Sequence, residues 1–154
     1  ADEPKFAEFY HTDFQQVQAA CGFDPRAAQV VAKLKEKGFT LALATNPIFP
    51  AIATESRMRW AGLDQNDFVL YTTYENSRHS KPNPDYYQDI LQHIGKKPEE
   101  CLMVGNDVTE DMIAASLGMK VFLLTDYLIN KHNQDMGCYP HGSFDVLMEF
   151  IQTL

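Results

Sequence analysis

The spacing of hydrophobic residues changes along the chain, and the changes predict alternating helices and strands. Apolar residues recur every three or four positions, as on the buried face of a helix, in residues 4–20, 27–37, 51–61, 84–94, 112–117 and 144–151. Short continuous apolar runs, typical of strands covered on both faces, occupy residues 39–44, 68–71, 102–104 and 120–124. From residue 27 onward helix and strand alternate. This order predicts an α/β fold, a Rossmann-like and mostly parallel sheet with helices on both faces.

Local signals mark the ends of several elements. Asn83-Pro84-Asp85 is a strong helix start, with an N-cap, a proline at the first helical position and an acid in the first turn. Gly95 is placed to end that helix. Residues 126–143 contain glycine and proline without a period, and we expect them to be irregular.

Composition limits the classes of function. The 154 residues suffice for about one domain, and a net charge of −8 argues against nucleic acid or an anionic membrane as the main partner. No apolar run approaches the ~18 residues of a membrane span. The three cysteines are widely spaced and form no CxxC pair, so we expect no disulfide framework and a reducing compartment, the cytoplasm.

An acidic loop follows the strand at 102–104. Gly105 makes a tight turn, and Asn106, Asp107, Glu110 and Asp111 come directly after it. Clustered oxygen ligands suit Mg²⁺, which prefers a few carboxylates, water and substrate phosphate. The alternative is an acidic first turn that complements a helix dipole.

Two other segments bear on this choice. Thr45 and Asn46 end the strand at 39–44, where a hydroxyl and a backbone N–H could donate to a phosphate, although a simple turn before Pro47 explains them as well. Lys81 lies between restricted backbone positions just before a helix and could neutralise a phosphate, although it could also be a solvated loop lysine. A hydroxyl, an ammonium and an acidic pocket together are the parts of a metal-assisted phosphoryl-transfer site.

Together these motifs resemble the haloacid dehalogenase-like (HAD) hydrolases, most of them Mg²⁺-dependent phosphatases. The resemblance covers about residues 25–154, and its motifs are Leu41-Ala42-Leu43-Ala44-Thr45-Asn46, Lys81-Pro82-Asn83-Pro84 and Val104-Gly105-Asn106-Asp107-Val108-Thr109-Glu110-Asp111. It implies that residues 25–154 are the α/β core and that residues 1–24 end a helical cap insertion. It also implies that Thr45 and Asn46 hold the transferring phosphoryl group of a small phosphorylated metabolite, with Thr45 and Lys81 as catalytic residues. Lys81 would contact the nucleophile and the phosphoryl group.

The metal-binding motif departs from the family pattern, in which an aspartate follows the glycine. Here Asn106 follows Gly105, and the acids are Asp107 and Asp111. Either Asp107 is the direct Mg²⁺ ligand, or Asn106 contributes its amide oxygen. We favour Asp107, with Asp111 oriented behind it.

The family's first motif, a strand ending in Asp-x-Asp that supplies the nucleophile, is absent from the sequence. In the family this strand is central, between the strands that end at Thr45 and Gly105. Without it both strands would leave buried N–H and C=O groups unpaired, at about 1–3 kcal/mol each. The missing strand must therefore exist in the native protein, or another segment must fill its place. We favour the first, and expect that the nucleophile lies upstream of residue 1, that this chain is the carboxyl-terminal portion of a longer protein, and that it is inactive alone. The alternatives are a non-catalytic HAD-like binding or regulatory domain and a metal-independent dehalogenase.

Overall fold

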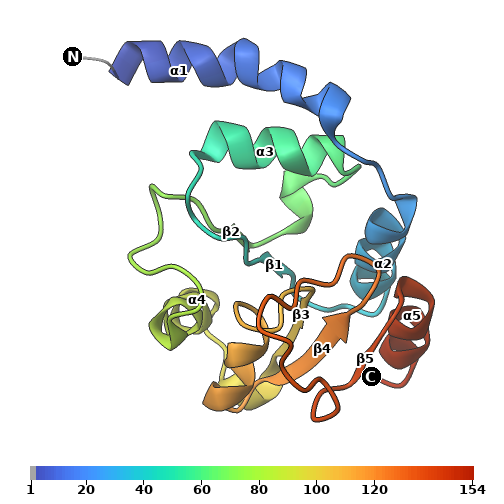
Figure 1. Cartoon of the computed structure of the whole chain (residues 1–154). Coiled ribbons are helices and arrows are strands. Elements are labelled where there is room, and N and C mark those ends of the chain that lie inside the picture. The colour runs from blue at the N-terminus through green and yellow to red at the C-terminus, as the bar shows by residue number, and fades with distance from the viewer. Residues whose placement is uncertain (1–2) are drawn as a thin grey trace. The chain divides into compact units, whose positions relative to one another are not determined.

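The computed structural model describes residues 3–154 (Figure 1). The chain divides into two units, Ala1–Asn76 and Ser77–Leu154. All strand pairs are parallel, which confirms the predicted α/β class. The strands form two sheets, however, β1-β2 and β3-β4-β5, where the sequence predicted one. Within residues 3–154, no helix combines the length and the apolar character needed to cross a bilayer.

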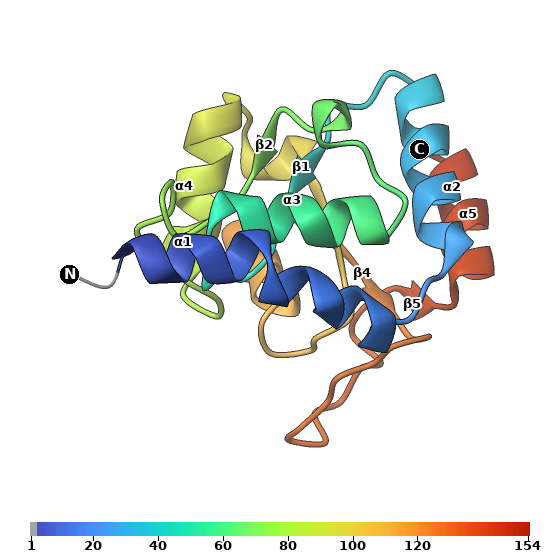
Figure 2. The same cartoon turned by 90° about the horizontal axis from the view of Figure 1, so that it is seen from above.

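The first unit is mostly helical. Its elements are α1 (Glu3–His11), the 3₁₀ helix η1 (Asp13–Ala20), α2 (Pro25–Glu36), β1 (Ala42–Leu43), α3 (Ala51–Trp60), the 3₁₀ turn η2 (Gln65–Asp67) and β2 (Leu70–Tyr71). β1 and β2 pair in parallel, with Ala42 opposite Leu70 and Leu43 opposite Tyr71. α1 and η1 run along α3, as both views show (Figures 1 and 2).

The predicted helix at 4–20 is divided at Thr12. Its φ of −117° and ψ of −81° leave the helical region, and a 3₁₀ helix follows. Phe14 is 7% exposed, and its ring lies 5.4 Å from that of Trp60 and 5.9 Å from that of Phe49. Gln15 Nε2 donates to Ser56 Oγ at 3.0 Å. These contacts with α3 and the residues before it override a continuous helical period, because tertiary packing outweighs local propensity.

The strand predicted at 39–44 is shorter and less buried than expected. Only Ala42–Leu43 pair as a strand, and both residues are half-buried. In the described part of the chain, β1 has a hydrogen-bonded neighbour strand on one side only, which is β2. A strand with one neighbour lacks the second ladder that would extend and cover it.

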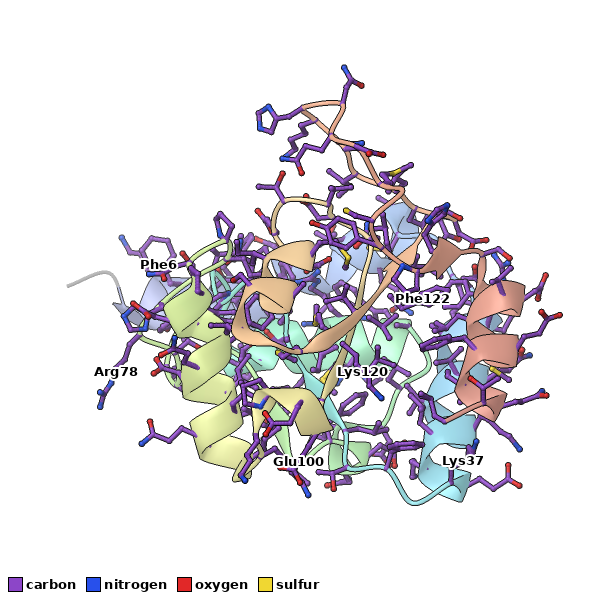
Figure 3. All side chains as sticks on the ribbon, turned by 90° about the horizontal axis from the view of Figure 1, so that it is seen from below. Phe6, Lys37, Arg78, Glu100, Lys120 and Phe122 are labelled. Atoms are coloured by element: carbon purple, nitrogen blue, oxygen red, sulfur yellow. The ribbon has the colours of Figure 1, made fainter. Side chains whose placement is uncertain are left out.

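The second unit contains the larger sheet. Its elements are α4 (Pro84–Ile94), the 3₁₀ turn η3 (Pro98–Glu100), β3 (Leu102–Gly105), the 3₁₀ helix η4 (Met112–Leu117), β4 (Lys120–Leu124), β5 (His141–Gly142) and α5 (Phe144–Gln152). β4 lies between β3 and β5. Phe122 of β4, labelled in Figure 3, packs on Phe150 of α5 with ring centroids 5.2 Å apart. The segment predicted as a helix at 112–117 is 3₁₀ rather than α-helical.

Local signals predicted α4 correctly but did not reveal β5. The Asn83 side chain accepts from Asp85 N at 2.9 Å, and Gly95 ends α4 at a φ of +64°. β5 lies inside the segment expected to be irregular. It exists because Leu123 N donates to Pro140 O and Thr125 N donates to Gly142 O, both at 2.9 Å. A two-residue strand has no period of its own, so only the pairing defines it.

Candidate active site

The site is built on the turn that ends β3. A Cβ on Gly105 would lie 2.2 Å from Asp111 Oδ2, so only glycine leaves room for this carboxylate. Asp111 Oδ2 accepts from Asn106 N at 2.9 Å and from Asp107 N at 3.0 Å. The carboxylate thus holds the first two amides after the strand and fixes the shape of the loop.

Lys81 reaches the same carboxylate from the loop before α4. Its Nζ donates to Asp111 Oδ1 at 2.5 Å, and the two side chains are 7% and 6% exposed. A pair this deeply buried offsets its desolvation only when its hydrogen bonds are good, and removing one partner is costly. Both oxygens of Asp111 therefore have protein donors, the ammonium on one and two amides on the other.

Asp107 also shapes the loop. Its Oδ1 accepts from Thr109 N and Glu110 N, both at 2.9 Å, in the manner of a cap on the turn that follows. One oxygen of Asp107, Oδ1, thus has the structural role that the sequence offered as the alternative to metal binding. Among the described residues, no hydrogen bond to the other oxygen, Oδ2, is present.

Asn106 is also held by hydrogen bonds with the segment after β4. Its Nδ2 donates to Tyr127 O at 2.6 Å, and Ile129 N donates to Asn106 O at 2.8 Å. Val108 N then donates to Ile129 O at 3.0 Å. The amide nitrogen has to face the Tyr127 carbonyl, so the Asn106 oxygen Oδ1 faces away from that carbonyl.

Two tyrosines at the start of α4 border the Lys81 ammonium. Nζ lies 6.0 Å from the ring centroid of Tyr86 and 5.9 Å from that of Tyr87, and both residues are 1% exposed. Tyr87 Oη donates to Glu110 O at 2.8 Å. Burial, and after it the charge of Asp111, raise the pKa of Tyr87 well above its usual value, so the hydroxyl keeps its proton. In the sequence, the only indication that these tyrosines lie near Lys81 is that they follow it by five and six residues.

The side-chain oxygens that remain in this loop are of the type that binds a hard cation. Asp107 Oδ2 and Asn106 Oδ1 are oxygen ligands of the type that Mg²⁺ takes. The charge of Asp111 is already compensated by Lys81. Within the described residues, no three His, Cys, Asp or Glu side chains gather into a metal-binding group. This loop would therefore supply only part of a Mg²⁺ site.

The structure brings together four of the six predicted site residues, Lys81, Asn106, Asp107 and Asp111. Thr45 and Asn46 belong to the first unit, so their approach to Lys81 stays a prediction. Within that unit Thr72 Oγ1 donates to Thr45 O at 2.6 Å, and Ile48 N donates to Asn46 O at 2.8 Å. The second bond closes a tight turn after β1, and the first ties the start of that turn to the residue that follows β2.

Two other acids, the N-cap of α2 and a residue of the loop after β4, each accept a hydrogen bond from the first turn of a helix. Asp24 accepts from Arg26 N at 3.0 Å at the start of α2. Asp126 accepts from Phe144 N at 2.8 Å at the start of α5. Both carboxylates thus have a structural role at the start of a helix.

Comparison with known proteins identifies relatives with phosphatase names. The family model for haloacid dehalogenase-like hydrolases matches residues 2–118. The chain is 33% identical over 79 residues to the pyrophosphatase PpaX of Bacillus cereus, covering 51% of this chain and 35% of the relative. It is 30% identical over 105 residues to the glyceraldehyde 3-phosphate phosphatase of Methanothermobacter thermautotrophicus, covering 68% and 45%. The chain thus spans less than half the length of these curated relatives.

Solved structures share the fold. A HAD phosphatase from Thermococcus onnurineus matches with a TM-score of 0.67 at 21% identity, over 83% of this chain and 57% of that one. CbbY from Rhodobacter sphaeroides, solved in complex with phosphate, matches with a TM-score of 0.67 at 22% identity, over 84% and 59%. At these identities the similarity establishes the architecture alone.

Proposed function

Because this chain belongs to the haloacid dehalogenase-like hydrolases, we propose that the whole protein is a Mg²⁺-dependent phosphatase acting on a small phosphorylated metabolite. One observation carries the proposal. Lys81 presents an ammonium that is almost buried, yet in the described part of the chain only the Asp111 carboxylate accepts a hydrogen bond from its three N–H donors. A buried cation with donors to spare is suited to an anionic group such as a phosphoryl oxygen.

In the proposed reaction the first carboxylate of an Asp-x-Asp motif upstream of residue 1 attacks the phosphorus. The second acid of that motif gives its proton to the leaving oxygen, so that the substrate departs as an alcohol. Water then hydrolyses the resulting aspartyl phosphate. Lys81 donates to a phosphoryl oxygen and to the nucleophile, and Asp111 holds the ammonium in place. Thr45 and Asn46 bind the phosphoryl group through a hydroxyl and a backbone N–H. Residues 1–24 belong to the end of a cap. This part of the proposal rests on the family resemblance.

Asp107 and Asn106 are the residues we propose to hold Mg²⁺, with Asp111 behind them. The ion would neutralise phosphoryl charge as it develops in the transition state. Its remaining ligands would be waters, the phosphoryl group and the upstream carboxylate, because this loop offers only one carboxylate oxygen without a recorded protein donor.

The test is hydrolysis of a generic aryl phosphate by the full-length protein. We expect phosphate release with Mg²⁺ and none after chelation with EDTA. Release that persists without a divalent metal would favour a metal-independent hydrolase of the same scaffold. No release across a panel of phosphomonoesters would contradict the proposed function.

Substitution of Asp107 separates a ligand from a turn cap. We expect Asp107→Ala to abolish phosphate release. Asp107→Asn can still accept through one oxygen, so it should keep the fold but raise the Mg²⁺ concentration needed for half-maximal activity by at least about tenfold. Activity would be measured against Mg²⁺ concentration, and folding by circular dichroism. Asp126→Asn, at a carboxylate that accepts from the first amide of α5, is the matched control. If Asp107→Asn needed no more Mg²⁺ than the unmodified protein, Asn106 would be the direct ligand and Asp107 would not.

The second candidate is a non-catalytic HAD-like binding domain, which the absence of an Asp-x-Asp in this sequence favours. A strand ending in Asp-x-Asp upstream of residue 1 would exclude it.

We also propose that the protein acts in the cytoplasm, and its three free cysteines support a reducing compartment.

A further inference from the structure

We propose that Tyr86 and Tyr87 are positioning residues, which hold the Lys81 ammonium at the place where it meets the phosphoryl group. The inference rests on the proposed function and assigns a role to two side chains that the motif leaves unassigned. The two rings lie 6.0 and 5.9 Å from Nζ, and the Asp111 carboxylate lies 2.5 Å from it. Two rings and one carboxylate thus confine the ammonium.

The rings suit a cation better than an aliphatic wall would. A ring face is negative and attracts an ammonium, whereas leucine at the same place would remove water without compensation. Lysine is also among the side chains with the most rotamer freedom to lose, so its head needs several contacts to stay in one place. Asp111 holds the ammonium by one hydrogen bond, and the two rings add contacts that this bond does not supply.

The rings themselves are held rigidly. Their centroids are 5.0 Å apart with planes at 81°, an edge-to-face contact in which each ring sets the plane of the other. Tyr87 Oη donates to Glu110 O, in the residue next to Asp111. The carboxylate and the ring that border the ammonium are therefore tied to the same loop, and any displacement of that loop moves both.

The first test measures the order of the ammonium directly. In full-length protein the ¹⁵N relaxation of the Lys81 ammonium, assigned through Lys81→Arg, gives its order parameter without any substrate. We expect Tyr86→Leu and Tyr87→Leu to lower that order parameter, while Tyr86→Phe and Tyr87→Phe, which keep the rings, preserve it. Leu91→Ala is the matched control, because Leu91 is a buried residue of the same helix.

The second test measures catalysis with an aryl phosphate. We expect each leucine variant to lower kcat by about 3- to 30-fold, the effect of losing one cation–π contact, with KM changed less than about threefold. The phenylalanine variants should remain within about threefold of the unmodified kcat.

The outcomes separate this inference from the proposed function. Loss of ammonium order in the leucine variants, with retention in the phenylalanine variants and in Leu91→Ala, supports the positioning role whether or not the protein hydrolyses phosphate. Unchanged order in the leucine variants, or an equal loss in Leu91→Ala, overturns it. Inactivity of the unmodified protein would contradict the proposed function and leave the relaxation measurement decisive for the tyrosines.

Discussion

At the scale of single residues, the site depends on a contact between a glycine and a carboxylate. Asp111 can hold the amides of Asn106 and Asp107 and also accept from Lys81 because Gly105 leaves space beside it. Sequence reasoning identified the loop and the lysine but could not supply this relation. The contact lies across a turn, where neither periodicity nor residue type reports distance.

We expect Gly105→Ala to displace the Asp111 carboxylate and leave the Lys81 ammonium buried without its partner. Breaking a buried ion pair from one side costs about 3–5 kcal/mol, so the free energy of unfolding should fall by that amount. Urea denaturation followed by circular dichroism measures it. In full-length protein, affinity for inorganic phosphate should fall in parallel.

Gly22→Ala is the control for that substitution. A Cβ on Gly22 would meet no atom within 4 Å, and its backbone does not require a positive φ. Its stability should change by less than about 0.5 kcal/mol. An equal loss in both variants would mean that the space beside Gly105 is unimportant.

At the scale of elements, η1 is anchored to α3 rather than projecting as a free helical tail. Phe14 is central to this anchor, with its ring between those of Tyr10, Phe49 and Trp60. We expect Phe14→Ala to cost about 3–5 kcal/mol of unfolding free energy, because it opens a cavity in an aromatic cluster. Fluorescence of Trp60, the one tryptophan of the chain, reports both the local environment and the unfolding transition.

Phe6→Ala provides the comparison within the same amino-terminal segment. Phe6 is 65% exposed, so its removal should change stability by less than about 0.5 kcal/mol. If Phe14→Ala were equally harmless and left the Trp60 emission unchanged, η1 would not be docked on α3 in solution.

The start of α3 has a pH-dependent cap. Pro50 gives no side-chain cap, and Ala51 N instead donates to both carboxylate oxygens of Glu75 at 3.1 Å. Burial opposes ionisation, but the Thr73 hydroxyl and the Ala51 amide outweigh it and lower the pKa of Glu75 below its usual 4.5. A carboxyl whose folded pKa is lowered stabilises the fold above its unfolded pKa and loses that contribution as the pH falls through the folded value.

We therefore expect Glu75→Gln to lower the urea midpoint at pH 7 and to differ less from the unmodified protein as the pH falls below about 4.5. Urea titrations at a series of pH values measure the difference. Glu99→Gln, a change at an exposed glutamate of η3, should show no such convergence. A constant difference at every pH would show that ionised Glu75 does not cap α3.

Elements with local signals were predictable and elements defined by pairing were not. Asn83, Pro84 and Gly95 sit at fixed offsets from the ends of α4, and the helix lies where they indicate. β5 has only His141 and Gly142, and partners 18 residues away in β4 define it. The division at Thr12 was equally invisible, because α-helices and 3₁₀ helices bury apolar residues at similar spacing.

At the scale of the whole molecule, the parallel α/β class followed from the alternation of helix and strand, but the division into two sheets did not. Sequence alternation indicates which elements exist, whereas neighbours within a sheet depend on every strand present. The same limit applies to the site. Motif order suggested that Thr45 and Lys81 act together, but the two residues lie in different units, so their distance remains a prediction.

We expect the 154-residue chain alone to release no phosphate from an aryl phosphate, with or without Mg²⁺. It retains Lys81 and the acidic loop but has no Asp-x-Asp motif to supply the proposed nucleophile. The assay needs circular dichroism to verify folding and full-length protein as the positive control. Turnover by the chain alone would require a nucleophile among its own residues and would overturn the assignment upstream.

The close approach of Gly105 and Asp111 also matters for finding relatives of this protein in sequence collections. Because the Asp111 carboxylate lies on the glycine, an insertion or deletion between the two would break the loop, whereas the bond from residue 106 to that carboxylate comes from its backbone amide and does not require an acidic side chain there. A search that requires an acid directly after the glycine would discard this chain. In this chain the loop is defined instead by a glycine and an aspartate six positions later, with a lysine-proline pair upstream.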